Sequence, residues 1–523
     1  MKLSGKNQIK RRSALIKSFE LGASLPLLLQ FPSAFAADHK ATNKKSKNIQ
    51  SKFSNTLEQD SDELSLAPGY EAKLLINYGD VLSHKKDVFG DCNDLITCFP
   101  YPNKDSLRFA LLGINHEEFH PLYVSGRSEN EPVSPEHLKK EMHAVGVSII
   151  AVEKRENGFW QFIENDPYNR RLDANTIIEF SGQQQIAGSS FAKGTLANCS
   201  GGKTPWGTFI SGEENYQDFF GDQVLNMQTG KRDFSSSSFG WETLDKRPPE
   251  HYGWLTEINP FNGSAKKLIP LGRFRHEGAT IIISKDKRAV AYSGNDRDGG
   301  CIYKFVSDTA TSLDNGTLYV ASIDRGEWLA LDIDKNADLK KNFKSQLDVL
   351  INCHAAARLI GGTAMERPED IKIDPKSGAV YVALTNSVSR GNYNGYVLRI
   401  SEQEDYSGRH FNAEPFIAGG QQSGFYCPDN LMFDSHGDLW LTTDVTEKML
   451  GKGPYAEFKR NALFKIPMSG PNQYKPTLIA KAPFDAEFTS PCLAPDGKVC
   501  SCRFNILVRA RSRYKNSPAP GQL

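Results

Sequence analysis

Five short segments of the sequence share one pattern, in which a potential metal ligand stands at the start of an apolar strand that ends at a polar turn. The residues concerned are Cys199, Glu277, Glu369, Asp429 and Glu487. Carboxylates that are brought together away from water repel one another and bind protons unless a cation neutralises them. The repetition therefore indicates a metal centre rather than five unrelated surface acids.

The ligand types indicate two kinds of cation. Carboxylate oxygens suit Ca²⁺, which takes six to eight oxygens at about 2.3–2.6 Å. Further oxygens could come from the acidic doublets Glu117 with Glu118 and Glu213 with Glu214, which end other apolar strands. Thiolate is a soft ligand that prefers a transition metal, so Cys199 favours a second metal type. A small buried core residue fits the same position of Cys199 equally well, and both interpretations stay open at this point.

Five pairs of apolar strands supply the frame for these ligands. In each pair, the first strand ends in acidic or amide residues, a loop follows, and a second apolar strand returns. The pairs are residues 109–118 with 145–154, 206–215 with 252–260, 289–298 with 301–308, 380–387 with 395–401, and 439–446 with 462–467. Such regular repeats predict the blades of an all-β propeller. The ligand-bearing strands would line its axis and form one central funnel.

Composition narrows the class of partner. The chain has 523 residues, with 63 Lys and Arg against 62 Asp and Glu and a formal net charge of +1. This balance offers no electrostatic surface for nucleic acid or for an anionic membrane. The 43 Gly and 27 Pro favour many turns and short strands. We therefore expect small-molecule partners and an all-β fold.

The ends of the chain differ from the middle. Residues 1–36 predict a twin-arginine-type signal peptide, because Arg11 and Arg12 precede a weakly apolar run that ends in Ala34-Phe35-Ala36. Residues 37–67 are polar and predict a flexible linker, and residues 68–499 form the predicted propeller. We expect export by the twin-arginine machinery to the periplasm or medium, without stable insertion in the membrane.

The nine cysteines are an odd number, so at least one of them should be unpaired or bind something. Cys92 and Cys98 are close enough in the sequence to form a local disulfide. Two buried thiols would explain the same pair equally well.

The motifs resemble those of the PhoX family of alkaline phosphatases. The resemblance extends from about Phe89 to Asp444. It rests on FGDCNDLITCFPY, LLGINHEE, DPYNRRLD, LANCSGGKTPWGTFISGEEN, RHEGATI, GNDRDGGCIYKFV, RPEDIKID, YVALTN and PDNLMFD. It implies a six-bladed β-propeller with long inserted loops and a central cofactor of Fe³⁺ and Ca²⁺. The implied reaction is hydrolysis of phosphate monoesters with release of inorganic phosphate, and we expect a monomer.

The resemblance also implies roles for single residues. Cys199 in NCSGG resembles the thiolate ligand of iron, Glu277 in RHEGAT a carboxylate shared among metals, and Glu369 in RPED a calcium ligand. Arg367 resembles the cation that grips the phosphate, for which a planar guanidinium is suited. Other metal ligands are expected among residues that fall in matching segments. These are Glu117, Glu118, Glu213, Glu214, Asp296 and Asp429.

The C-terminal residues depart from the family pattern. Residues 500–523 are basic and lack the alternation of a strand, which predicts an incomplete last blade and an unstable or inactive product. Two other functions remain as alternatives. One is a calcium-dependent propeller lactonase or esterase, which has no need of a cysteine ligand. The other is a non-catalytic propeller that calcium stabilises.

Overall fold

The computed structural model describes residues 64–85, 87–128, 131–484 and 486–495, together with the backbone of two short strands near the C-terminus. The chain divides into two compact units, Met1–Ser51 and Lys52–Leu523. The first unit lies outside the described residues. So do the predicted signal peptide, most of the predicted linker and most of residues 500–523, including Cys500 and Cys502.

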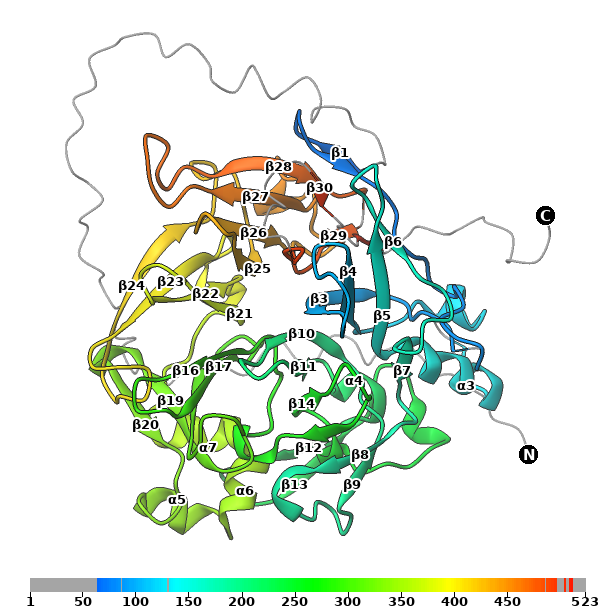
Figure 1. Cartoon of the computed structure of the whole chain (residues 1–523). Coiled ribbons are helices and arrows are strands. Elements are labelled where there is room, and N and C mark those ends of the chain that lie inside the picture. The colour runs from blue at the N-terminus through cyan, green and yellow to red at the C-terminus, as the bar shows by residue number, and fades with distance from the viewer. Residues whose placement is uncertain are drawn as a thin grey trace, which may run out of the picture. The chain divides into compact units, whose positions relative to one another are not determined.

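Five sheets of four or more strands form the blades of a β-propeller (Figure 1). The first holds β3 (Asn93–Pro100), β4 (Phe109–His116), β5 (Gly146–Lys154), β6 (Trp160–Phe162) and β7 (Arg170–Leu172), with β6 and β7 both paired to β5. The second has the order β10 (Asn198–Lys203), β11 (Phe209–Glu213), β14 (Leu255–Ile258), β15 (Ala265–Lys267), β8 (Ile177–Phe180) and β9 (Phe191–Lys193).

The other three blades follow in chain order. The third holds β16 (Thr280–Ile283), β17 (Ala289–Gly294), β18 (Ile302–Ser307), β19 (Gly316–Ser322) and β20 (Glu327–Ala330). The fourth holds β21 (Pro368–Ile373), β22 (Val380–Leu384), β23 (Tyr396–Glu402) and β24 (Phe411–Ala418). The fifth holds β25 (Pro428–Phe433), β26 (Leu439–Thr443), β27 (Ala462–Ile466) and β28 (Thr477–Lys481), and the N-terminal β1 (Ser65–Leu66) pairs with β28.

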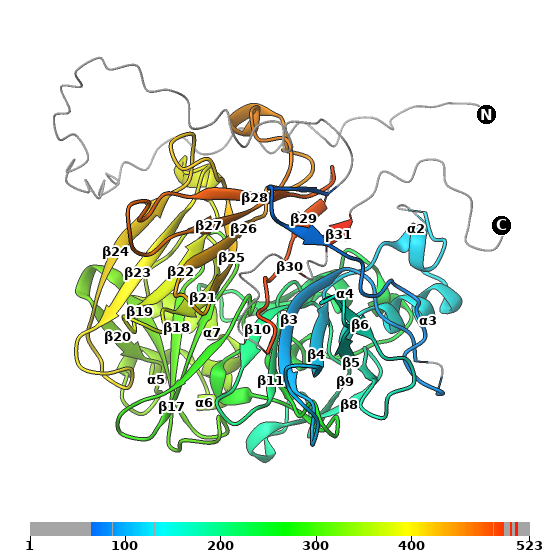
Figure 2. The same ribbon diagram turned by 45° about the horizontal axis from the view of Figure 1, so that its top comes forward.

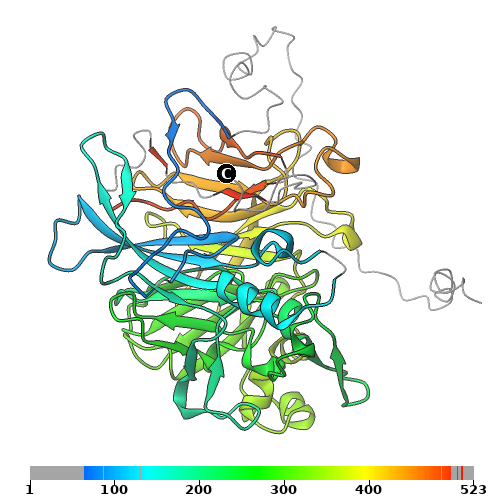
Figure 3. The same ribbon diagram turned by 90° about the vertical axis from the view of Figure 1, so that its right-hand side faces the viewer.

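The remaining elements lie outside these sheets. Three strand pairs are β2 (Glu71–Ala72) with β30 (Arg503–Phe504), β12 (Asp222–Leu225) with β13 (Arg232–Ser235), and β29 (Ala486–Phe488) with β31 (Val508–Ala510). The α-helices are α2 (Pro121–Val124), α3 (Pro135–Ala144), α4 (Gln217–Phe220), α5 (Ala337–Asn342), α6 (Gln346–Ile351) and α7 (Cys353–Leu359). In Figure 3 the cyan helix α3 lies at the front, on the outside of the blades.

The predicted all-β propeller is confirmed, but the number of blades is five rather than six. The five predicted strand pairs are the second and third strands of the five blades. Around the ring, β10 contacts β3 and β16, and β21 contacts β17 and β25. Between the fifth blade and the first, the described strands form pairs rather than a full sheet, among them β29 with β31 (Figure 2). There β29 contacts β26 and β27, while β31 contacts β3.

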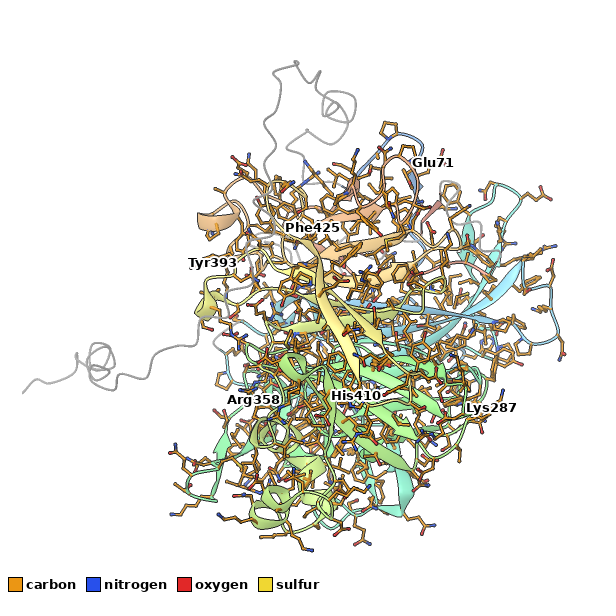
Figure 4. The ribbon with its side chains drawn as sticks, turned by 90° about the vertical axis from the view of Figure 1, so that its left-hand side faces the viewer. Glu71, Lys287, Arg358, Tyr393, His410 and Phe425 are labelled. Atoms are coloured by element: carbon orange, nitrogen blue, oxygen red, sulfur yellow. The ribbon has the colours of Figure 1, made fainter. Side chains whose placement is uncertain are left out.

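Apolar side chains fill the space between neighbouring blades. Phe425, labelled in Figure 4, is fully buried and packs with Tyr381 of β22 and Leu441 of β26, which joins the fourth blade to the fifth. Trp328 of β20 joins the third blade to the fourth, because it belongs to one hydrophobic cluster with Ile371 of β21. These contacts fix the blades relative to one another, and so they fix the inner strands around the axis.

Candidate metal centre

The inner strand of each blade begins with an extra residue, and a candidate ligand lies there. At the starts of β3, β10, β21 and β25 the pairing with the next strand slips by one residue, so two residues oppose one. The first of the two is, in turn, Asp94, Cys199, Glu369 and Asp429. Ahead of β16, His276 pairs with Asn295 while Thr280 pairs with Tyr292, which leaves one extra residue in the segment with Glu277. Such bulges bend a strand and redirect its side chains.

The residue before each of these four bulged strands has a left-handed backbone. The φ angles are 40° at Cys92, 52° at Ala197, 54° at Arg367 and 49° at Cys427. Residues other than glycine adopt this conformation at a cost of order 1–3 kcal/mol, and such positions cluster at functional sites. The same local geometry therefore recurs in four blades and places one polar side chain from each at the axis.

The ligands form three overlapping groups, in each of which one ligand atom per residue lies within 4.8 Å of the others. The groups are Asp94 with Glu117 and Cys199, Cys199 with Glu214 and Glu277, and Glu277 with Glu369 and Asp429. Cys199 and Glu277 each belong to two groups, so the three form one continuous set. We call these seven residues the axial cluster.

Cys199 lies at the centre of this set. Its Sγ is 3.0 and 3.2 Å from the two carboxylate oxygens of Glu277 and 3.3 Å from Oδ2 of Asp94. Burial raises the pKa of the Cys199 thiol well above its ordinary value, and the nearby carboxylates raise it further. A thiol so placed keeps its proton unless a cation takes the proton's place.

The carboxylates of the axial cluster fit cations for the same reason. Burial raises the pKa of Glu277 well above its ordinary value, and the charges of Glu369 and Asp429 raise it further. Burial likewise raises the pKa of Glu214, whose buried Oε1 has no hydrogen-bond partner among the described residues. Hard carboxylate oxygens beside one soft thiolate match calcium together with a transition metal.

Glu213 lies elsewhere, although it precedes Glu214. Its Oε1 accepts hydrogen bonds from Nζ of Lys267 at 2.7 Å and from the hydroxyl of Thr195 at 2.9 Å. Its Oε2 accepts from the backbone amides of Gly253 and Trp254. Glu213 and Lys267 are both completely buried. β11 ends at Glu213, and of the two acids only Glu214, which follows the strand, lies in a group of candidate ligands.

Arg367 lies beside the cluster and is held by two carboxylates. Its Nε and Nη2 donate to the two oxygens of Asp296 at 2.8 and 2.7 Å, and Nη2 is 2.9 Å from Oε1 of Glu369. The Nη1 group makes no hydrogen bond to the described residues, and a quarter of the side chain is exposed. The structure therefore leaves one side of a fixed guanidinium available to an anion.

Three other candidate residues lie outside the axial cluster. Glu118 is half-buried and belongs to none of the three groups. Glu487 of β29 is buried, and its charge helps to raise the pKa of Asp429, after the larger effects of burial and of three other acids. Both ring nitrogens of His276 are hydrogen-bonded, to the hydroxyl of Ser293 and to the carbonyl of Gly272, which makes its imidazole structural.

Asp94 is the member of the axial cluster that the sequence did not reveal as a ligand. The signal was present, since Asn93-Asp94-Leu95 stands at a strand start as Cys199 and Asp429 do. Asp94 was missed because the repeated pattern was recognised from the second blade onward. No blade precedes β3 to mark where its strand begins. The proposed bridge between Cys92 and Cys98 is absent, because neither forms a disulfide among the described residues.

Comparisons with known proteins identify the family of the chain. The family model described as alkaline phosphatase PhoX matches residues 51–502. A solved structure, Pseudomonas fluorescens PhoX in complex with vanadate, a transition state analogue, shares 31% identity over 83% of this chain and 90% of that chain, with a TM-score of 0.73. A protein of unknown function from Dyadobacter fermentans shares 10% identity over 81% of this chain and 91% of its own, with a TM-score of only 0.34. No curated protein matches the chain.

The family match and the fold define a metal-dependent phosphatase built on a β-propeller. The chain belongs to the PhoX family of alkaline phosphatases, which hydrolyse phosphate monoesters. The family assignment decides for the phosphatase and against a lactonase, an esterase or a non-catalytic propeller. Among the described residues, no helix is long and apolar enough to cross a membrane.

Proposed function

We propose that the axial cluster is the catalytic centre and that it binds Fe³⁺ and Ca²⁺. The observation that carries the proposal is the 3.0 Å approach of the Cys199 sulfur to Glu277 inside a set of buried carboxylates. Seven buried acidic ligands cannot all ionise without cations. Cations bound there would neutralise the charge that develops on a phosphoryl group during its transfer.

We assign the ligands by their chemistry. Cys199 is the iron ligand, because thiolate is the softest donor of the set. Glu277 is shared between iron and calcium, because it belongs to the group of Cys199 and also to the group of Glu369 and Asp429. Glu369 and Asp429 then bind calcium, and Asp94, Glu117 and Glu214 complete the coordination. Glu213 and Glu118 are not in this set.

Arg367 binds the phosphate of the substrate in this proposal. Asp296 acts as a positioning residue, because its two oxygens hold Nε and Nη2 of Arg367 and leave Nη1 turned to an incoming anion. A guanidinium that is already fixed loses little conformational entropy when its remaining Nη1 group binds a phosphoryl oxygen. This role differs from that of a metal ligand, which the sequence motif suggested for Asp296.

The location follows from the predicted signal peptide. An exported phosphatase of this kind meets organic phosphate esters outside the cytoplasm and releases inorganic phosphate for uptake. The propeller closes on itself, so a monomer suffices for the site. Export through the twin-arginine machinery would let the protein fold and bind its metals before crossing.

The experiment is an assay of p-nitrophenyl phosphate hydrolysis before and after calcium chelation, with iron and calcium measured on the same samples. We expect activity that chelation abolishes and that added Ca²⁺ restores, together with bound iron. In Cys199→Ser we expect iron to be lost, whereas Cys98→Ser, a change in a cysteine outside the axial cluster, should keep it. Full activity in protein that contains no iron would refute the assignment of Cys199.

A further inference from the structure

A second group of mixed ligands lies at the start of the first blade. Sγ of Cys92 is 3.4 Å from Nδ1 of His120, and the same nitrogen is 3.0 Å from Oδ2 of Asp91. One ligand atom from each residue lies within 4.8 Å of the other two. The group shares no residue with the axial cluster.

We propose that Asp91, Cys92 and His120 form a separate binding site for one Zn²⁺. A thiolate at about 2.3 Å and an imidazole nitrogen at about 2.0 Å from a tetrahedral Zn²⁺ are about 3.5 Å apart, and an imidazole and a carboxylate are about 3.3 Å apart. The observed separations of 3.4 and 3.0 Å fit a small tetrahedral ion. Ca²⁺ does not fit this donor set, because it takes six to eight oxygens.

The thiol of Cys92 and the carboxylate of Asp91 both approach the same ring nitrogen of His120. Nδ1 of a neutral imidazole carries either one hydrogen, which Asp91 can accept, or one lone pair, to which the thiol can donate. A cation at the point where the three atoms converge would bind all of them, with release of the thiol proton.

Asp91, Cys92 and His120 are accessible enough for a metal ion to reach them from solvent. Cys92 is 6% exposed, while the side chains of His120 and Asp91 are 28% and 12% exposed. Three protein ligands on the inner side would leave the fourth position of the ion to water from the open side.

The proposed ion would join two segments that carry axial ligands. Cys92 directly precedes β3, which carries Asp94, and His120 follows the segment with Glu117. The backbone amide of Glu117 already donates to the carbonyl of Cys92 at 3.0 Å. Zn²⁺ would lock this contact, so its role is to hold Asp94 and Glu117 in position.

Cobalt tests the site because a Co²⁺–thiolate bond gives a charge-transfer absorption band. Full-length Cys199→Ser protein, which lacks the axial thiolate, is titrated with Co²⁺ and then with competing Zn²⁺. We expect one equivalent of Co²⁺ with a thiolate band, which Zn²⁺ abolishes. The band should disappear when Cys92→Ser is added and persist when Cys98→Ser is added instead.

His120→Asn in the same Cys199→Ser background is the second variant, and it carries the test if Cys92→Ser does not fold. We expect it to weaken Co²⁺ binding at least ~10-fold while the circular dichroism spectrum stays unchanged. Absence of a thiolate band in Cys199→Ser protein, or a band that survives Cys92→Ser, would overturn the proposal. Phosphatase activity does not enter this test, so its outcome is independent of the function proposed for the axial cluster.

Discussion

Glu213 and Glu214 are adjacent, yet their replacement by glutamine should have opposite effects. Glu213→Gln removes the charge that pairs with Lys267 at 2.7 Å, and neither side chain is exposed to solvent. The Lys267 ammonium would then keep only neutral acceptors, among them the carbonyl of His251 at 2.8 Å. Removing one member of a buried ion pair costs about 3–5 kcal/mol, because the other charge stays buried without its counter-ion.

That cost can be measured by urea unfolding. With a slope of about 3 kcal/mol per M, the midpoint of Glu213→Gln should fall by on the order of 1 M, both with and without metals. Glu214→Gln should leave the midpoint of metal-free protein unchanged or higher, because it removes a buried carboxyl whose pKa is raised by burial and by the charge of Asp296. In metal-loaded protein the same change should lower metal content and activity.

The two variants are each other's control, since the substitution is identical and the positions are consecutive. Loss of bound metal in Glu213→Gln without a lower unfolding midpoint would refute the placement of Glu213 beside Lys267. An equal fall of the metal-free midpoint in Glu214→Gln would refute the argument that Glu214 faces the axial cluster.

Three other predictions concern Arg367, the carboxylate of Asp296 that positions it, and the buried Lys304. Arg367→Lys should lower kcat/KM on p-nitrophenyl phosphate by about 10²–10³, because lysine lacks the planar fork, while Arg399→Lys on an exposed pair should have no effect. Asp296→Asn should raise KM and keep the metal content, and loss of calcium would instead make Asp296 a ligand. Burial lowers the pKa of Lys304 to about 8 from its ordinary 10.5, so between these values the unfolded chain binds a proton that the folded chain has released. Between these pH values the free energy of unfolding should therefore rise by up to about 1.4 kcal/mol per pH unit. The Lys304→Met variant should lack this rise. Parallel stability curves for the two proteins would contradict this.

Much of the fold could be predicted from the sequence because its signals are local. Alternating apolar residues and repeated polar turns marked the second and third strands of all five blades. The convergence of Cys199, Glu277, Glu369 and Asp429 at the axis could be expected because each stands at a strand start in a repeated motif. The number of blades could not be predicted from the sequence. It depends on whether the residues after the fifth blade pair into a full sheet.

Which acid of a doublet faces the axis was decided only by the tertiary structure. Glu213 and Glu214 are equivalent in the sequence, and the buried Lys267 that pairs with Glu213 comes from β15, more than fifty residues away. The approach of Asp296 to Arg367 and the convergence of Asp91, Cys92 and His120 likewise depend on bulges and contacts between blades. Residue types along one strand determine which chemistry is available, whereas ionic and metal-binding geometry depends on distances between segments that are remote in the chain.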